Sequence, residues 1–119
     1  IFAIDIDSLA ISSAKQNFLL NEIQKTNIIT SRGSIKELKL LLNNQKLDFL
    51  MCNIISSIIL ELAPNFSEVI KLNGFLILSG LLAKEIPMLI PKFKELGWEI
   101  VSKSEKDGWG LIRLRYINC

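Results

Sequence analysis

The sequence predicts an α/β fold built on a mostly parallel β-sheet. Short apolar runs alternate with segments of helical periodicity, which is the order that parallel strands joined by crossover helices require. The run from Phe49 to Cys52 contains no polar residue, as expected of a strand that is buried on both faces of a sheet. Asp107 and Gly108 form a hairpin-turn signal, so one antiparallel strand should lie at or near an edge of the sheet.

The N-terminal part of the chain predicts two strand–helix units. Asp7 is expected to cap the first helix, because its carboxylate can accept the free amide protons of the first turn. The expected elements are, in order, a strand over 1–6, a helix from about 8 to 21, a strand over 26–30, a turn over 31–34 and a short helix over 35–42.

The remainder predicts two further strand–helix units and a final hairpin. Pro64 should break the helix near Ala63, and Pro91 should bend the next one, whereas Pro87 fits a first turn and Gly97 a helix end. The expected elements are a strand over 47–52, a helix over 56–71, a turn over 72–74, a strand over 75–78, a helix over 83–96 and strands over 98–103 and 109–116.

Composition excludes several classes of function. The chain has 119 residues, enough for one compact domain, and no His, which excludes His-based catalysis and His metal sites. Cys52 and Cys119 form neither a disulfide framework nor a zinc pattern, so we expect no metal site and favour a reduced, cytoplasmic protein. The net charge is +2 with dispersed Lys and Arg, which does not indicate nucleic-acid binding, and no apolar run is long enough to span a bilayer.

The first residues suggest a piece of a longer protein. Ile1 leads directly into a predicted strand, where a complete protein would rarely begin. We therefore expect residues 1–119 to form a single, partial domain.

Polar or small residues follow several predicted strands, where open parallel sheets bind their ligands. Asp5 suits the two hydroxyls of a ribose, although it could also cap a helix. Gly33 and Ser34 could present a free amide to an adenine edge, or simply form a turn and an N-cap. Asn53 could bind the amino-acid part of a cofactor or a substrate amine, because its amide donates and accepts, or it could cap the next helix.

Two further groups have a structural explanation that we favour. Ser79 and Gly80 end a predicted strand and are expected to turn the chain, unless the glycine lets the backbone approach a ligand closely. Trp98 and Trp109 are expected to pack in the core or at a sheet edge. We assign no residue as a general base.

Together these segments resemble the class I S-adenosylmethionine-dependent methyltransferases, and in particular the PrmA-type enzymes, which methylate the eleventh protein of the large ribosomal subunit. The resemblance covers nearly the whole chain. The segments that carry it are Ala3–Asp7, Asp48–Ile54, Glu61–Pro64, Leu76–Ala83 and Trp109.

The resemblance implies a Rossmann-like sheet of which this chain carries the second strand onward, with the first strand and its glycine-rich loop missing. It implies that S-adenosylmethionine is the cofactor, with Asp5 on its ribose and Asn53 near the reacting methyl. Ser79 and Gly80 would then lie near the substrate entrance. The implied cofactor-binding residues are Asp5, Ile6, Gly33, Ser34 and Asn53.

The implied reaction is methyl transfer to an amine of a ribosomal protein, on lysine side chains or the N-terminal amine. The substrate would be recognised mainly by a missing N-terminal domain, without direct contact to nucleic acid or membrane. In the family's strand order, the missing strand lies between those that carry Asp5 and Asn53. Since that leaves buried backbone groups unpaired, we predict that this piece alone binds cofactor poorly and is inactive.

Asn53 is followed by Ile54-Ile55-Ser56 rather than by two prolines and an aromatic residue, which argues against the related enzymes that methylate glutamine or adenine.

Three alternatives remain. Another class I methyltransferase, acting on a nucleic acid or small molecule, is the first alternative. A dehydrogenase nucleotide-binding domain would use Asp5 equally well, but the hairpin after Gly97 disfavours it. A non-enzymatic, receiver-like domain leaves Asn53 without a role.

Overall fold

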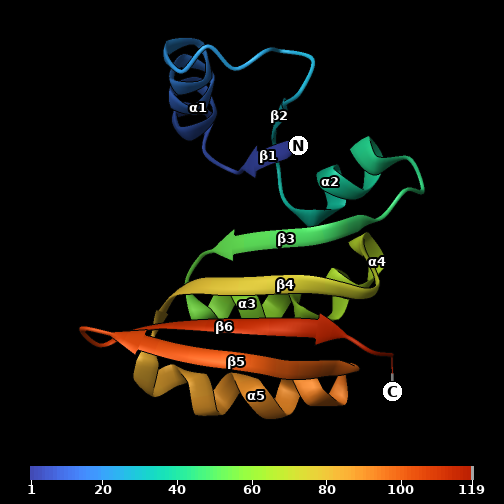
Figure 1. Cartoon of the computed structure of the whole chain (residues 1–119), viewed down its shortest axis with the longest axis vertical. Helices are drawn as coiled ribbons and strands as arrows, with labels where there is room; N and C mark the ends of the chain where they lie inside the picture. Colours follow the sequence, from blue (N-terminus) through green and yellow to red (C-terminus); the bar gives the residue numbers. More distant parts are fainter. Residues whose placement is uncertain (119) are drawn as a thin grey trace. The chain divides into compact units, whose positions relative to one another are not determined.

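The computed structural model describes residues 1–118 and divides the chain into two compact units. The N-terminal unit comprises residues 1–44, and the C-terminal unit begins at Gln45. Each unit is an α/β arrangement in which helices follow strands (Figure 1).

The N-terminal unit contains a two-stranded parallel sheet and two helices. The elements are β1 (Phe2–Asp5), α1 (Ser8–Leu20), β2 (Ile29–Arg32) and α2 (Ile35–Leu42). Asp7 caps α1 as predicted, because its Oδ1 accepts the Leu9 amide at 2.9 Å. The left-handed backbone of Asn43, with φ of 47°, ends α2 at the predicted residue.

The second strand lies further along the chain than predicted. Ser31 and Arg32, expected in a turn, belong to β2 because they pair in register with Ile4 and Asp5 of β1. Of the β-branched residues that suggested a strand from Thr26, Thr26 and Ile28 precede β2, and Ile29 and Thr30 belong to it. Pairing with β1, rather than local β-propensity, therefore sets the bounds of this strand.

The C-terminal unit contains a four-stranded mixed sheet with the order β3-β4-β6-β5. Its strands are β3 (Leu47–Asn53), β4 (Ile70–Leu82), β5 (Trp98–Lys106) and β6 (Trp109–Tyr116). Strand β3 is parallel to β4, and β6 is antiparallel to both of its neighbours, so the predicted antiparallel strand lies next to the edge. Asp107 and Gly108 form the predicted turn, with φ of 53° and 81°.

Proline positions divide the helices of this unit. The helical elements are α3 (Ser56–Leu62), the 3₁₀ turn η1 (Ala63–Asn65), α4 (Phe66–Val69), the 3₁₀ turn η2 (Ala83–Glu85) and α5 (Ile86–Glu95). The break that Pro64 predicts therefore falls at Ala63, and Pro87 occupies the first turn of α5. The predicted turn over 72–74 is wrong, since β4 runs without interruption from Ile70 to Leu82. Asn73, with φ of 65°, lies within this strand, at the point where its register against β3 shifts.

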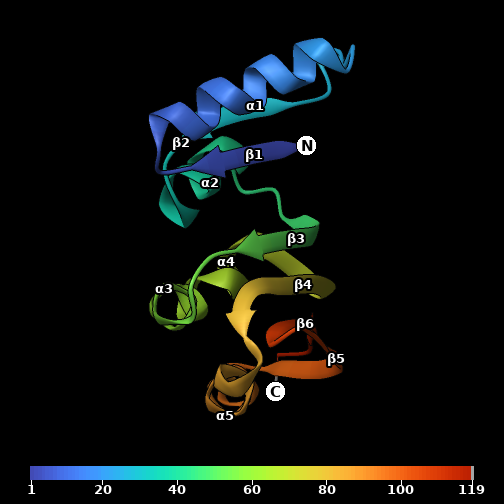
Figure 2. The same ribbon diagram turned by 90° about the vertical axis from the view of Figure 1, so that its left-hand side faces the viewer.

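The core of the C-terminal unit lies on one face of its sheet. Figure 2 shows α3, α4 and α5 on the same side of the four strands. The ring of Phe93 contacts Phe66 and Trp98, each at 6.3 Å between centroids, which confirms Trp98 as a packing residue. The fully buried aliphatic side chains of this layer include Ile59, Leu76, Leu78, Leu89, Ile112 and Leu114.

The opposite face of the sheet is open, and this corrects the prediction for β3. Phe49 is 47% and Met51 72% exposed, whereas a strand covered on both faces would bury both side chains. The physical reason is that all helices of this unit cover the other face, and that β3 is the edge strand next to β4.

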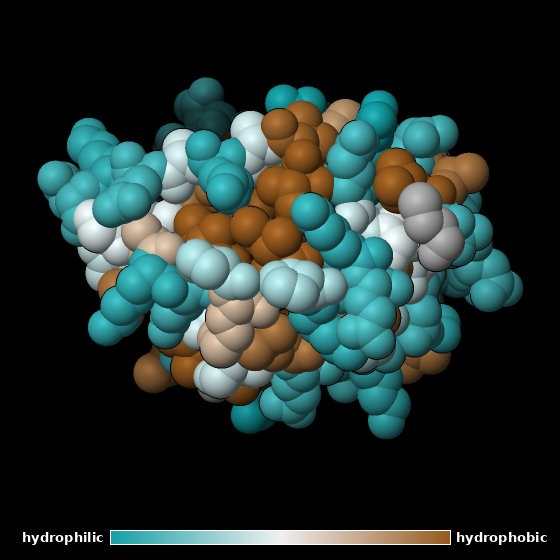
Figure 3. Space-filling view, turned by 90° about the horizontal axis from the view of Figure 1, so that it is seen from below, coloured by the Kyte–Doolittle hydropathy of each residue, from teal (hydrophilic) through white to brown (hydrophobic). Residues whose placement is uncertain are grey.

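Apolar side chains also gather at the end of the molecule formed by β5 and α5, where hydrophilic side chains surround them (Figure 3).

Candidate active site

Four of the predicted site residues lie together in the N-terminal unit. Asp5 ends β1 and Ile6 follows it, while Gly33 and Ser34 follow the neighbouring strand β2. The Gly33 amide donates a hydrogen bond of 2.9 Å to the Asp5 carbonyl, which joins the two chain segments. Parallel pairing thus brings together residues that are almost thirty positions apart in the sequence, at the carboxyl ends of both strands.

The Asp5 carboxylate is exposed and held in one orientation. Its Oδ1 accepts the Asp7 amide at 2.9 Å, while Oδ2 has no partner among residues 1–118. Ile6, next to it, is 71% exposed, and its carbonyl accepts the Arg32 Nε at 2.9 Å. A fixed carboxylate with a free oxygen beside an exposed apolar side chain can bind a ligand that has hydroxyl groups and a flat apolar part.

The amides expected to be free at Gly33 and Ser34 are already paired, which corrects that expectation. Gly33 donates to Asp5, and the Ser34 amide donates to Glu37 Oε2 at 2.7 Å. This hydrogen bond lowers the pKa of the Glu37 carboxyl below its ordinary value. Ser34 is the N-cap of α2, as the structural alternative predicted, so a ligand contact here would have to use its side chain.

Asn53 belongs to a separate group of residues in the C-terminal unit. It ends β3, it is exposed, and it lies in register with Ser79 of the neighbouring strand β4. Asn53, Ser79 and Gly80 line an open hollow of about 500 Å³. The polar residue predicted at the end of an apolar strand therefore faces a cavity large enough for a small molecule or a side chain.

The other lining residues of this hollow come from the β5–β6 hairpin, which the sequence did not assign to the site. The lining residues of the hairpin are Ser104, Glu105, Lys106, Trp109, Gly110 and Leu111. Trp109 is 58% exposed, so it does not pack in the core, and the expected packing at an edge stays a prediction. An aromatic residue directly after an Asp-Gly turn was the available signal, but only the fold of the hairpin shows where the ring lies.

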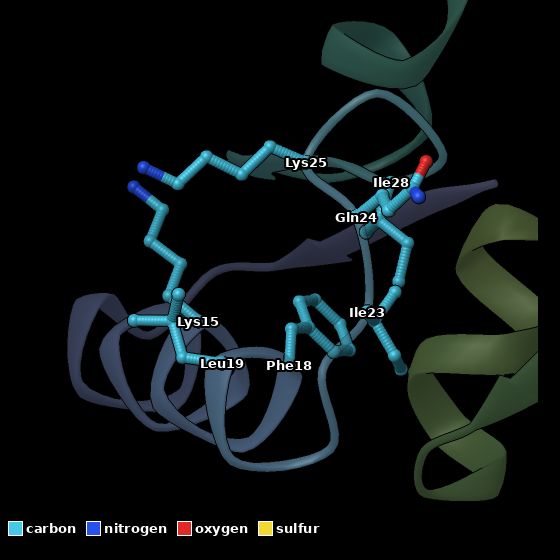
Figure 4. A pocket seen from close by; sticks show the side chains of 7 residues that line it. All are labelled: Lys15, Phe18, Leu19, Ile23, Gln24, Lys25 and Ile28. Atoms are coloured by element: carbon cyan, nitrogen blue, oxygen red, sulfur yellow. The ribbon is translucent and has the colours of Figure 1, made fainter.

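A second, smaller pocket of about 60 Å³ lies in the N-terminal unit, away from the predicted site residues. Phe18, Ile23 and Ile28 line it, together with the long side chains of Lys15 and Lys25 (Figure 4). It is lined by none of the residues predicted to bind a cofactor.

Other chemically active groups are sparse. Burial raises the pKa of the Cys52 thiol to about 11, so it remains protonated and unreactive at neutral pH. Cys119 lies outside the described residues. Within residues 1–118, no group of three His, Cys, Asp or Glu side chains is placed to hold a metal ion. The helices of that range are all too short or too polar to cross a membrane.

Solved structures with the same arrangement define the class of protein. A ribosomal protein L11 methylase from Lactobacillus delbrueckii subsp. bulgaricus matches with a TM-score of 0.83 and 25% identity over 97% of this chain and 57% of its own. An rRNA methylase from Streptococcus thermophilus matches with a TM-score of 0.74 at 13% identity, over 98% of this chain and 72% of its own. The fold is that of the class I methyltransferases.

The family follows from the sequence comparisons. The model of the family "Ribosomal protein L11 methyltransferase (PrmA)" matches residues 1–116, and this chain belongs to that family. Two curated relatives, both ribosomal protein L11 methyltransferases, come from Prochlorococcus marinus and Parasynechococcus marenigrum. They are 40% and 34% identical over 94% and 97% of this chain. The chain spans 37% and 40% of their lengths.

Proposed function

We propose that the two units are parts of one catalytic domain in a longer S-adenosylmethionine-dependent methyltransferase. Its substrate is a protein of the large ribosomal subunit, and the groups that it methylates are amines, on lysine side chains or at the N-terminus. The observation that carries this proposal is the position of Asn53, at the carboxyl end of a parallel strand and in the wall of the hollow. Membership of the PrmA family supports the choice of reaction and substrate.

The residues present fit S-adenosylmethionine. The free Oδ2 of Asp5 can accept hydrogen bonds from ribose hydroxyls, because Oδ1 is already used by the Asp7 amide. The exposed side chain of Ile6 offers apolar surface beside it, and the Ser34 side chain follows the neighbouring strand. The carboxamide of Asn53 could donate to or accept from a ligand in the hollow, and would contact the methyl donor or the amine. When bound, this cofactor supplies an activated sulfonium methyl group.

The chain itself contributes positioning rather than acid–base chemistry. It has no His, and Glu105 is the one carboxylate among the residues that line the hollow. A neutral amine that attacks a sulfonium methyl in line needs orientation and removal of water more than a base. Asn53 and Trp109 would orient the amine in the hollow, whose lining carries one carboxylate, Glu105, and one ammonium group, Lys106.

The proposed partner and location follow from the same substrate. A ribosomal protein is met in the cytoplasm, and we propose that this chain works there without direct contact to nucleic acid or membrane. A specific test is the choice of substrate. A chimera, in which this chain replaces the matching segment of the Prochlorococcus marinus relative, should methylate free ribosomal protein L11. Transfer to ribosomal RNA but not to the protein would reject the proposed substrate.

Asp5 and Asp7 offer a matched pair for testing the cofactor. Both carboxylates are exposed, but only Asp5 has a free oxygen at the strand end, whereas Asp7 caps α1. In the chimera, Asp5→Ala should weaken S-adenosylmethionine binding by at least about tenfold in calorimetry, since a charge-assisted hydrogen bond contributes roughly 1.5–3 kcal/mol. Asp7→Ala should leave that affinity nearly unchanged. Equal affinities in both variants would refute the ribose assignment.

The isolated chain should bind the cofactor poorly and be inactive. Within residues 1–118, β1 pairs only with β2, and β3 pairs only with β4, so each leaves one row of backbone groups without a strand partner. We propose that a further strand completes the sheet in the longer protein. Tight binding of S-adenosylmethionine to these 119 residues alone would show that no further strand is needed.

A further inference from the structure

The proposed role of Asn53 depends on where its side chain points, and the neighbouring strand controls this. Ser79 lies opposite Asn53 in the parallel register, and Gly80 comes next. A Cβ placed on Gly80 would lie 2.5 Å from Asn53 Oδ1 and 3.2 Å from the Ile54 nitrogen. The space in which the Asn53 carboxamide rests therefore exists only because residue 80 has no side chain.

A β-bulge brings Gly80 to this position. Leu78 and Leu81 of β4 pair with Ile112 and Gly110 of β6, so that two residues of β4, Ser79 and Gly80, face the single residue Leu111. Gly80 has φ of +74°, the left-handed conformation that favours glycine in such a bulge. Bulges bend a strand and redirect its side chains, and this one lies in the wall of the hollow.

We propose that Gly80 is a positioning residue for Asn53: the bulge holds the glycine against the carboxamide and fixes its direction within the hollow. This inference rests on the proposed function, because Asn53 must matter for methyl transfer if its orientation is to matter. It adds that the turn-forming explanation of Ser79 and Gly80 is incomplete. The left-handed backbone makes the turn, while the missing Cβ leaves room for Asn53.

The chain contains a matched control. Gly108, in the hairpin turn, has φ of +81°, yet a Cβ there would meet nothing within 4 Å. Alanine at either position adopts the same unfavourable backbone conformation, but only at Gly80 does it collide with another residue. The atom that it meets first is the end of a flexible side chain, so Gly80→Ala should turn Asn53 away rather than unfold the sheet.

The first experiment observes the side chain directly. Side-chain amide resonances of Asn53 are recorded by nitrogen-15 NMR in this chain with Gly80→Ala or Gly108→Ala. We expect a clear shift of the Asn53 signals with Gly80→Ala and none with Gly108→Ala. Unchanged signals in a folded Gly80→Ala variant would overturn the positioning, whatever the activity of the longer protein.

The second experiment measures methyl transfer by the chimera in a double-mutant cycle. Gly80→Ala should lower kcat by about a hundredfold, the loss expected when a positioning group is displaced by an ångström. Gly108→Ala should change kcat by less than about threefold, since a Cβ at Gly108 would meet nothing within 4 Å and would leave Asn53 in place. Adding Gly80→Ala to Asn53→Ala should cause no further loss. If the two losses multiply instead, Gly80 acts independently of Asn53 and the inference is wrong. If Asn53→Ala alone leaves kcat unchanged, the proposed function of Asn53 fails, and the NMR result still decides the positioning.

Discussion

The two units differ in how much apolar surface each one buries. The C-terminal unit has a continuous layer of buried side chains between its four strands and the helices on one face. In the N-terminal unit, the buried apolar side chains are confined to Ile35, Leu38 and Leu42 of α2. Helix α1 buries no residue, and its Leu9, Leu19 and Leu20 are exposed.

This difference separates the proposed cofactor residues into a stable and a weakly stabilised group. Asn53 stands on a strand that is paired to a well-packed sheet, whereas Asp5 stands at the end of a four-residue strand in a two-stranded sheet. Two-stranded sheets are marginal in water unless a hydrophobic face is covered. The ribose end of the proposed site should therefore depend more on the rest of the longer protein than the methyl end does.

Hydrogen exchange on the chain should give the largest contrast. Amides of β4 and β6 at Leu76, Leu78 and Leu114 lie in the buried layer and should open only when the C-terminal unit unfolds. Amides of β1 and β2 should exchange at least about a hundredfold faster, since few buried contacts oppose their local opening. Mass spectrometry of peptic peptides measures both. Equal protection in the two units would show that the N-terminal unit is stabilised as well as the larger one.

A pair of leucine substitutions should sharpen the same comparison. Leu78 of β4 is fully buried, so Leu78→Ala should lower the free energy of unfolding of the C-terminal unit by about 2–5 kcal/mol. Leu20, at the end of α1, is 80% exposed, and Leu20→Ala should change it by less than about 0.5 kcal/mol. Urea titration followed by the fluorescence of the buried Trp98 reports on this unit. A large effect of Leu20→Ala would mean that α1 supports the C-terminal core.

Substitution of the exposed Trp109 should affect the function of the hollow and leave the stability of the core nearly unchanged. Trp109→Ala in the chimera should lower kcat/KM for the ribosomal protein by about tenfold, because a large aromatic ring that is proposed to position the amine is removed. The melting temperature should change little, because the ring is more than half exposed. A loss of stability without a loss of kcat/KM would indicate that Trp109 only packs, as the sequence alone had suggested.

Sequence reasoning succeeded where local chemistry decides the structure. The Asp7 cap, the end of α2 at Asn43, the break at Ala63 and the Asp107-Gly108 turn each depend on a few adjacent residues. It failed where pairing decides. The start of β2, the continuity of β4 through Asn73 and the exposure of Phe49 all depend on neighbouring strands and on which face the helices cover.

The candidate site shows the same division. Asp5 and Asn53 could be found because polar residues at strand ends are visible in the sequence. The pairing of the Gly33 and Ser34 amides depends on Asp5 and Glu37, and the contact between Gly80 and Asn53 depends on a bulge opposite Leu111. Strand register brings Gly33 to Asp5 and Gly80 to Asn53, and no spacing in the sequence encodes it, whereas the Ser34–Glu37 pair is a local capping box.

The smallest predicted effect concerns Cys52, on the helix-covered face of β3. Burial raises the pKa of its thiol from 9.0 to about 11, so the folded chain binds this proton more tightly than the unfolded chain does. The resulting contribution to stability is complete below pH 9.0 and is lost as the pH rises toward about 11, because only the unfolded chain ionises in that interval. Urea titrations should show a lower free energy of unfolding at pH 10 than at pH 8. This difference should be smaller in the Cys52→Ala variant. The same fall in both proteins would assign it to other groups, and would mean that this face of β3 is wetter than the core beside it.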